Sequence, residues 1–124
     1  NHLSKYRCAI QIKDVNEEYY QVESSEDFVS LLAIGQWRRQ LIKHADEEIL
    51  VMKSGSGHWV FYSDGTVGAY MGEGRMKKYA YYKIPSDVAD RMIDYIRANG
   101  IVREAESFGD GFFDYEEQAY NRIY

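Results

Sequence analysis

The chain of 124 residues has a net charge of −5, with 45% apolar and 28% charged residues, which is ordinary for a single globular domain spanning residues 1–124. A single cysteine excludes an intrachain disulfide, and no apolar run approaches the ~20 residues that cross a bilayer, so we expect a cytoplasmic protein without membrane contact. The acidic balance disfavours direct binding to a nucleic-acid backbone.

The first third of the chain predicts a hairpin followed by a helix. Apolar residues alternate from 6 to 13, and turn residues at 14–17 lead to a second strand over 18–23. Two serines and two acids at 24–27 are typical of a helix start. Apolar residues then recur at helical spacing as far as Ile42, which predicts one helix ending near residue 44.

The middle of the chain predicts four strands. Their expected ranges are 48–53, 58–63, 66–71 and 77–84. The connections between them are too short for parallel crossovers, so the strands should form an antiparallel meander. Asp64-Gly65 predicts a tight hairpin turn, because both residues tolerate positive φ.

A second helix and an acidic segment complete the chain. Residues 85–87 predict the helix start, and Asn99-Gly100 predicts its end in the left-handed conformation. Residues 101–103 predict a short edge strand, and 112–124 a short terminal helix. The order ββα-ββββ-α, followed by an acidic aromatic C-terminal segment, predicts an α+β fold. Its two layers would be an antiparallel β-meander sheet and helices packed on one face.

The segment 104–124 is the most distinctive, because six acids and six aromatic rings are interleaved there with only one base, Arg122. Aromatic anchors surrounded by acids suit an interface with a basic protein. The first hypothesis is therefore a non-enzymatic protein-binding module, such as an acidic inhibitor or immunity-type protein that neutralises a basic, nucleic-acid-handling partner. The expected contact residues are Phe112, Phe113, Asp114, Tyr115, Glu116 and Glu117. The competing interpretation is a terminal helix that packs its aromatic rings on the sheet.

A second hypothesis is a sheet that binds a small ligand or single-stranded nucleic acid. Trp59 and Tyr81 would supply the stacking surfaces of such a site. The residues Arg75, Lys77 and Lys78 would supply a basic hairpin beside it. Core packing of the same aromatic side chains is the competing interpretation.

A third hypothesis is a small enzyme centred on His58, with Asp64 and Glu73 as carboxylate partners. The favoured interpretation of His58 is a solvated histidine at the edge of a loop. The three histidines lack the spacing of zinc ligands, and Gly72-Glu73-Gly74-Arg75 lacks the context of a phosphate-binding loop. No catalytic residue, metal site or cofactor is therefore predicted, and Cys8 is interpreted as a small buried core residue.

Overall fold

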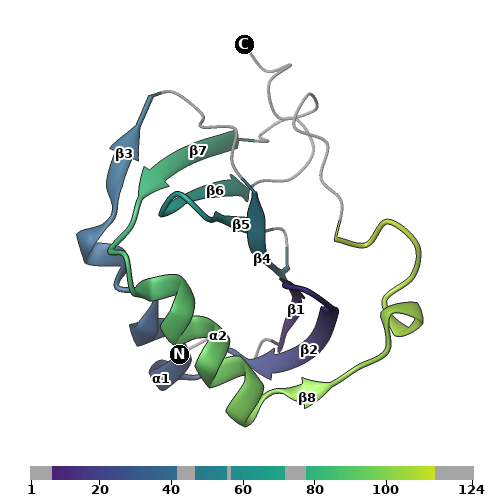
Figure 1. Ribbon diagram of the computed structural model, residues 1–124. Helices are drawn as coiled ribbons and strands as arrows, with labels where there is room; N and C mark the ends of the chain where they lie inside the picture. Colours follow the sequence, from purple (N-terminus) through teal and green to yellow (C-terminus); the bar gives the residue numbers. More distant parts are fainter. Residues whose placement is uncertain (1–6, 42–46, 56, 72–77, 114–124) are drawn as a thin grey trace.

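The computed structural model describes residues 7–41, 47–55, 57–71 and 78–113 (Figure 1). Within these ranges eight strands form one antiparallel sheet in the order β3-β7-β6-β5-β4-β1-β2-β8. The sheet curves strongly, and helix α2 lies across its open side (Figure 1). The fold is therefore α+β with an antiparallel sheet, as the sequence predicts.

The predicted meander is present in the middle of the sheet. It consists of β4 (Glu48–Ser54), β5 (Gly57–Tyr62), β6 (Thr66–Met71) and β7 (Lys78–Lys83). The turn between β5 and β6 lies at the predicted place. There Gly65 has a φ of +81°, and the Asp64 carboxylate accepts a hydrogen bond of 3.1 Å from the Thr66 amide.

The predicted opening hairpin extends the meander on one side. It consists of β1 (Arg7–Lys13) and β2 (Glu17–Glu23). β1 also pairs with β4, with Ile10 opposite Met52, so the hairpin and the meander form one continuous sheet. The predicted edge strand β8 (Ile101–Val102) pairs with β2 and ends the sheet there.

The two helices begin near their predicted positions. In α1 (Glu26–Leu31) the Ser25 hydroxyl accepts a hydrogen bond of 3.2 Å from the Phe28 amide, so a serine caps the helix as expected. α2 (Val88–Asn99) follows Asp87, whose side chain pairs with Arg91 and makes no capping hydrogen bond. Among the described residues, no helix is both long enough and apolar enough to cross a membrane.

The predicted left-handed end of α2 is wrong, because Gly100 has a φ of −75°. Glycine is needed here for close packing instead. A Cβ on Gly100 would lie 2.6 Å from the Ile96 carbonyl oxygen, 3.0 Å from Val22 and 3.2 Å from Tyr20. The absence of a side chain thus lets the end of α2 rest directly on β2.

The prediction of one helix reaching residue 44 is also wrong. The α-helix stops at Leu31, since Ala33 takes a left-handed conformation with a φ of +50° and redirects the chain. A short 3-10 helix, η2 (Ile34–Gln36), follows, and then the strand β3 (Arg38–Gln40) pairs with β7 at the other edge of the sheet. Strand pairing has overridden the helical spacing, and Leu41 is left 94% exposed. Ile42 lies outside the described residues.

The sheet has two differently covered faces. The helix face packs against α1 and α2 and includes Ile10, Leu50 and Phe61. The tyrosine face carries Tyr62, Tyr70 and Tyr81, among other residues. The tyrosine face packs against a segment near the C-terminus, which begins with the 3-10 helix η3 (Ala105–Ser107) and includes three phenylalanines. The core therefore lies on both sides of the sheet.

Candidate functional site

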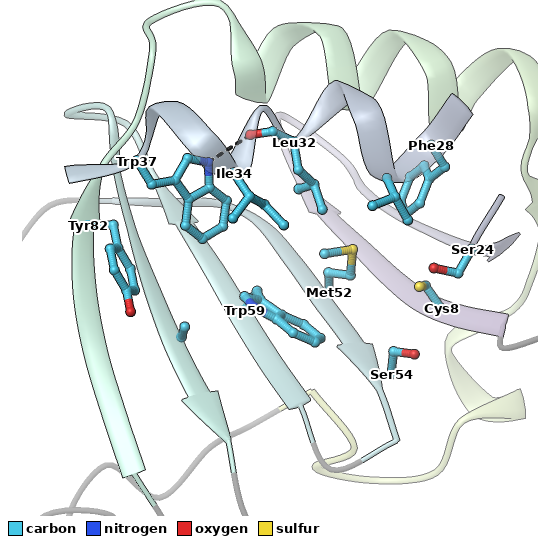
Figure 2. A pocket seen from close by; sticks show the side chains of 12 residues that line it. Cys8, Ser24, Phe28, Leu32, Ile34, Trp37, Met52, Ser54, Trp59 and Tyr82 are labelled. Atoms are coloured by element: carbon cyan, nitrogen blue, oxygen red, sulfur yellow. Dashed lines mark hydrogen bonds between the residues drawn. The ribbon is translucent and has the colours of Figure 1, made fainter. Parts of the chain in front are cut away.

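A cavity of about 400 Å³ lies between the α1–η2 region and the helix face of the sheet (Figure 2). Twelve side chains from the hairpin, α1, η2 and the meander surround it. They are Cys8, Ser24, Phe28, Val29, Leu32, Ile34, Trp37, Met52, Ser54, Trp59, Ala69 and Tyr82. No lining residue is an acid, a lysine, an arginine or a histidine, so the cavity is mainly apolar.

Large aromatic side chains form one end of the cavity. The Trp37 indole nitrogen donates a hydrogen bond of 2.7 Å to the Leu32 carbonyl oxygen, which fixes the ring beside the end of α1 (Figure 2). The Tyr82 ring lies 5.5 Å from the Trp37 ring, measured between centroids. Both rings thus offer apolar faces to a bound molecule, while the indole N–H of Trp37 already has its hydrogen-bond acceptor.

Trp59 forms part of the cavity floor because Gly57 leaves room for it. A Cβ on Gly57 would contact the far end of the indole, lying 2.7 Å and 2.9 Å from two of its ring carbons. Residues two positions apart on a strand normally point their side chains to the same face of the sheet. Here the missing side chain of Gly57 allows the Trp59 ring to lie along the strand.

Three small polar side chains form the opposite end of the cavity. Figure 2 shows Cys8, Ser24 and Ser54 together, away from Trp37 and Tyr82. Burial raises the pKa of the Cys8 thiol, and hydrogen bonding with Ser54 and Ser24 opposes this rise only in part. The thiol is therefore protonated at neutral pH, and this end of the cavity offers neutral hydrogen-bonding groups.

Of the described residues proposed for the ligand-binding sheet, Trp59 lines the cavity. Tyr81, its expected partner, lies on the tyrosine face, where its ring is buried, so the structure does not bring the two side chains together. Arg75 and Lys77 lie outside the described residues, as does the side chain of Lys78, which begins β7. Strand alternation could have grouped Cys8 with Met52 and Trp59, but only with the register known.

The residues of the enzyme hypothesis are not assembled into a site. His58 is the second residue of β5 and is buried, so its interpretation as a solvated residue at a loop edge is wrong. Asp64 lies beyond the other end of β5, roughly 20 Å away by strand geometry, and its carboxylate binds Thr66. Glu73 lies outside the described residues. Within the described part of the chain, no group of three metal-ligating side chains gathers.

The first two residues of the predicted protein-binding segment pack on the tyrosine face. Phe113 is buried and lies 5.8 Å from the Tyr19 ring, while Phe112 is half-buried. The Lys53 ammonium lies 4.3 Å from the centre of the Phe112 ring and donates a hydrogen bond of 3.2 Å to the Phe112 carbonyl oxygen. The other four predicted contact residues, Asp114, Tyr115, Glu116 and Glu117, lie outside the described residues.

No protein-family model matches the chain, and neither the curated proteins nor the solved structures include a significant match to it. Fold resemblance therefore adds nothing to the functional assignment, which depends on the chemistry of the site. Among the described residues, the cavity is the place where apolar surface, aromatic rings and a few polar groups converge on one open space. Those are the usual features of a small-molecule site.

Proposed function

We propose that this protein binds a small, mainly apolar ligand in the helix-face cavity. The observation that carries the proposal is the cavity itself, whose volume of about 400 Å³ falls in the range usual for ligand pockets. Two other hollows in the described part of the chain are as large but have polar and charged linings, so the apolar, aromatic lining of this cavity is what favours a ligand site.

The arrangement of the lining suits a ligand with an elongated apolar body. Aromatic rings at one end and on the floor provide large contact surfaces, and aliphatic side chains from α1 and η2 cover them from above (Figure 2). The serine and cysteine end provides hydrogen-bonding groups without a charge. Binding alone accounts for this set of residues, and no nucleophile with an activating base is among them.

Tryptophan fluorescence offers a direct test, because the chain has two tryptophans and both line the cavity. Titration with decanoate and with 1-decanol should change the emission saturably. Ala69→Leu, which extends a side chain into the cavity, should weaken binding by at least about ten-fold. Ala80→Leu is the matched control, because Ala80 lies directly opposite Ala69 on β7 but does not line the cavity. Equal binding by both variants would place the ligand elsewhere.

The acidic C-terminal segment supports a second proposal, the binding of a basic protein. Glu104, Glu106 and Asp110 are exposed, and none of them forms an ion pair with a described basic residue. Unpaired surface acids attract a basic partner and speed its association. Because Phe113 packs in the core, the acids and not this ring would supply the contact.

Replacement of these three acids by amides tests the second proposal. Pull-down from native lysate with the full chain and with the triple variant should show loss of a basic partner from the variant only. The captured complex should also weaken as salt increases, because exposed charges are screened. Equal capture by both proteins, or capture that does not depend on salt, would argue against the proposal.

A further inference from the structure

We infer that the cavity ligand is an amphiphilic anion, with its apolar body in the cavity and its acidic head group against Arg39. This inference rests on the proposed ligand-binding function. It adds the chemical class of the ligand and the direction in which the ligand lies. A medium-chain carboxylate is the simplest molecule of this class.

Arg39 lies beside the aromatic end of the cavity. It belongs to the edge strand β3, where it is paired with Tyr82 of β7, one of the cavity-lining residues. Directly paired residues point to the same face of a sheet, so Arg39 and Tyr82 share the helix face. The central carbon of the Arg39 guanidinium lies 5.9 Å from the centre of the Tyr82 ring. A ligand leaving the cavity past Tyr82 therefore meets a guanidinium group.

The guanidinium of Arg39 is available for a ligand. Its side chain is exposed, and within the described part of the chain it forms no ion pair with a carboxylate. By contrast, Arg91 and Arg97 are both paired with acids, as expected in a chain with a net charge of −5. Arginine binds carboxylates and phosphates with two parallel hydrogen bonds, which favours an anionic head group at this position.

The opposite end of the cavity does not suit an anion. Cys8 and Ser24 are buried there, and the lining provides no cation near them. A carboxylate placed at that end would lose its hydration without gaining an opposite charge, which is strongly unfavourable. The head group is therefore assigned to the Arg39 end, and the apolar body extends past Trp59 toward Ser54.

The neighbouring residue Arg38 supplies a matched control. Successive side chains of a strand point to opposite faces, and Arg38 is paired with Lys83, away from the face of Tyr82. Arg38→Gln and Arg39→Gln remove the same charge from adjacent positions of one strand. Only the second removes it from the cavity side.

The test compares decanoate with 1-decanol, which share a hydrocarbon body, by tryptophan fluorescence at pH 7.5. For each protein the measured quantity is the ratio of the decanol Kd to the decanoate Kd. We expect Arg39→Gln to lower this ratio by about five-fold, the size of an exposed ion pair, and Arg38→Gln to change it by less than about two-fold. Arg39→Lys should restore much of the ratio, and thermal unfolding should confirm that all variants are folded.

The possible outcomes separate the two proposals. If the wild-type chain binds neither amphiphile, the proposed ligand-binding function fails together with this inference. If both bind but Arg39→Gln leaves the ratio unchanged, the binding function stands and the assignment of the head group is overturned. Equal effects of Arg38→Gln and Arg39→Gln would likewise overturn the assignment. They would indicate that long-range attraction by positive charge on β3, and not contact with Arg39, favours the carboxylate.

Discussion

The hydroxyl oxygens of Tyr70 and Tyr81 lie 2.9 Å apart on the tyrosine face, where both side chains are buried. Each hydroxyl thereby has a hydrogen-bond partner within the core. Burial, followed by the hydrogen bond with Tyr81, raises the pKa of Tyr70 far above its usual value of 10.0. Packing of the tyrosine face therefore keeps the Tyr70 phenol protonated to a higher pH than an exposed tyrosine.

Replacement of Tyr70 by phenylalanine should lower the free energy of unfolding by about 1–2 kcal/mol at neutral pH, because the Tyr81 hydroxyl loses a buried partner. Above pH 10 the difference in unfolding free energy between the wild type and Tyr70→Phe should narrow. The unfolded tyrosine ionises there while the folded one keeps its proton, so wild-type stability falls as the pH rises. Urea unfolding at pH 7.5 and at about pH 10.5 measures both effects. An identical pH dependence in Tyr70→Phe would contradict this reading of the pair.

Cys8 should react slowly with iodoacetamide in the folded protein. The thiol is buried and its pKa is raised, so little thiolate is present at pH 8. The rate should keep rising with pH beyond 9.0, the ordinary pKa of this group, where the rate of an exposed thiol levels off. Mass spectrometry of the single cysteine follows the reaction, with urea-unfolded protein as the reference. A bound decanoate should slow it further, and folded and unfolded rates that agree would show that the thiol is accessible.

Gly57→Ala should displace the Trp59 indole from the cavity floor. The new Cβ would occupy the position of the far ring carbons, and such overpacking typically costs about 1–3 kcal/mol. We expect a shifted tryptophan emission and weaker decanoate binding. Gly35→Ala is the control, because a Cβ there would meet no atom within 4 Å. Similar effects of the two substitutions on emission would mean that Gly57 does not position Trp59.

Arg97→Gln should destabilise the protein at neutral pH but not in acid. The Arg97 guanidinium lies 2.6 Å from the Glu18 carboxylate and 3.2 Å from that of Asp14. The pKa of Glu18 is lowered mainly by its hydrogen bond with Arg97. The pKa of Asp14 is lowered mainly by the hydrogen bond from the Val15 amide, and next by the one from Arg97. A lowered pKa stabilises the fold above the unfolded value, and this effect disappears as the pH falls through the folded value.

Because Arg97 and Glu18 are partly exposed, we expect Arg97→Gln to lower the free energy of unfolding by only about 1 kcal/mol or less. Urea unfolding at pH 7 and at about pH 3 measures it. Arg91→Gln removes a more exposed pair at the start of α2, with Asp87, and should lower the free energy of unfolding by less. A loss in Arg97→Gln that is equal at both pH values would indicate packing of the arginine stem rather than its charge.

Local patterns were sufficient to predict the hairpins, the meander and α2, because each depends on alternation or spacing within a few residues. They failed at β3. Ala33 adopts positive φ without being a glycine, and the pairing of β3 with β7 joins residues more than forty positions apart. A helical spacing of apolar residues cannot reveal that competing pairing. Without β3, the approach of Arg39 to Tyr82 could not be predicted either.

The candidate site was predictable only in part, for a reason of register. The ligand-binding hypothesis included Trp59, but its grouping with Tyr81 assumed that both rings lie on the same face of the sheet. In the structure Trp59 is opposite Ala69, which is opposite Ala80, so Tyr81 points to the other face. Local sequence patterns did not determine this register of β6 with β7. One shifted residue would have reversed every face assignment in β7.

The two ends of the sheet have a consequence for self-association. β3 contributes three residues, among them two arginines, and β8 contributes only two residues. Long, flat edge strands recruit other chains through their unpaired backbone groups, whereas short or charged edges offer little to join. Both ends of the eight-stranded sheet therefore offer few unpaired backbone groups with which another chain could extend it.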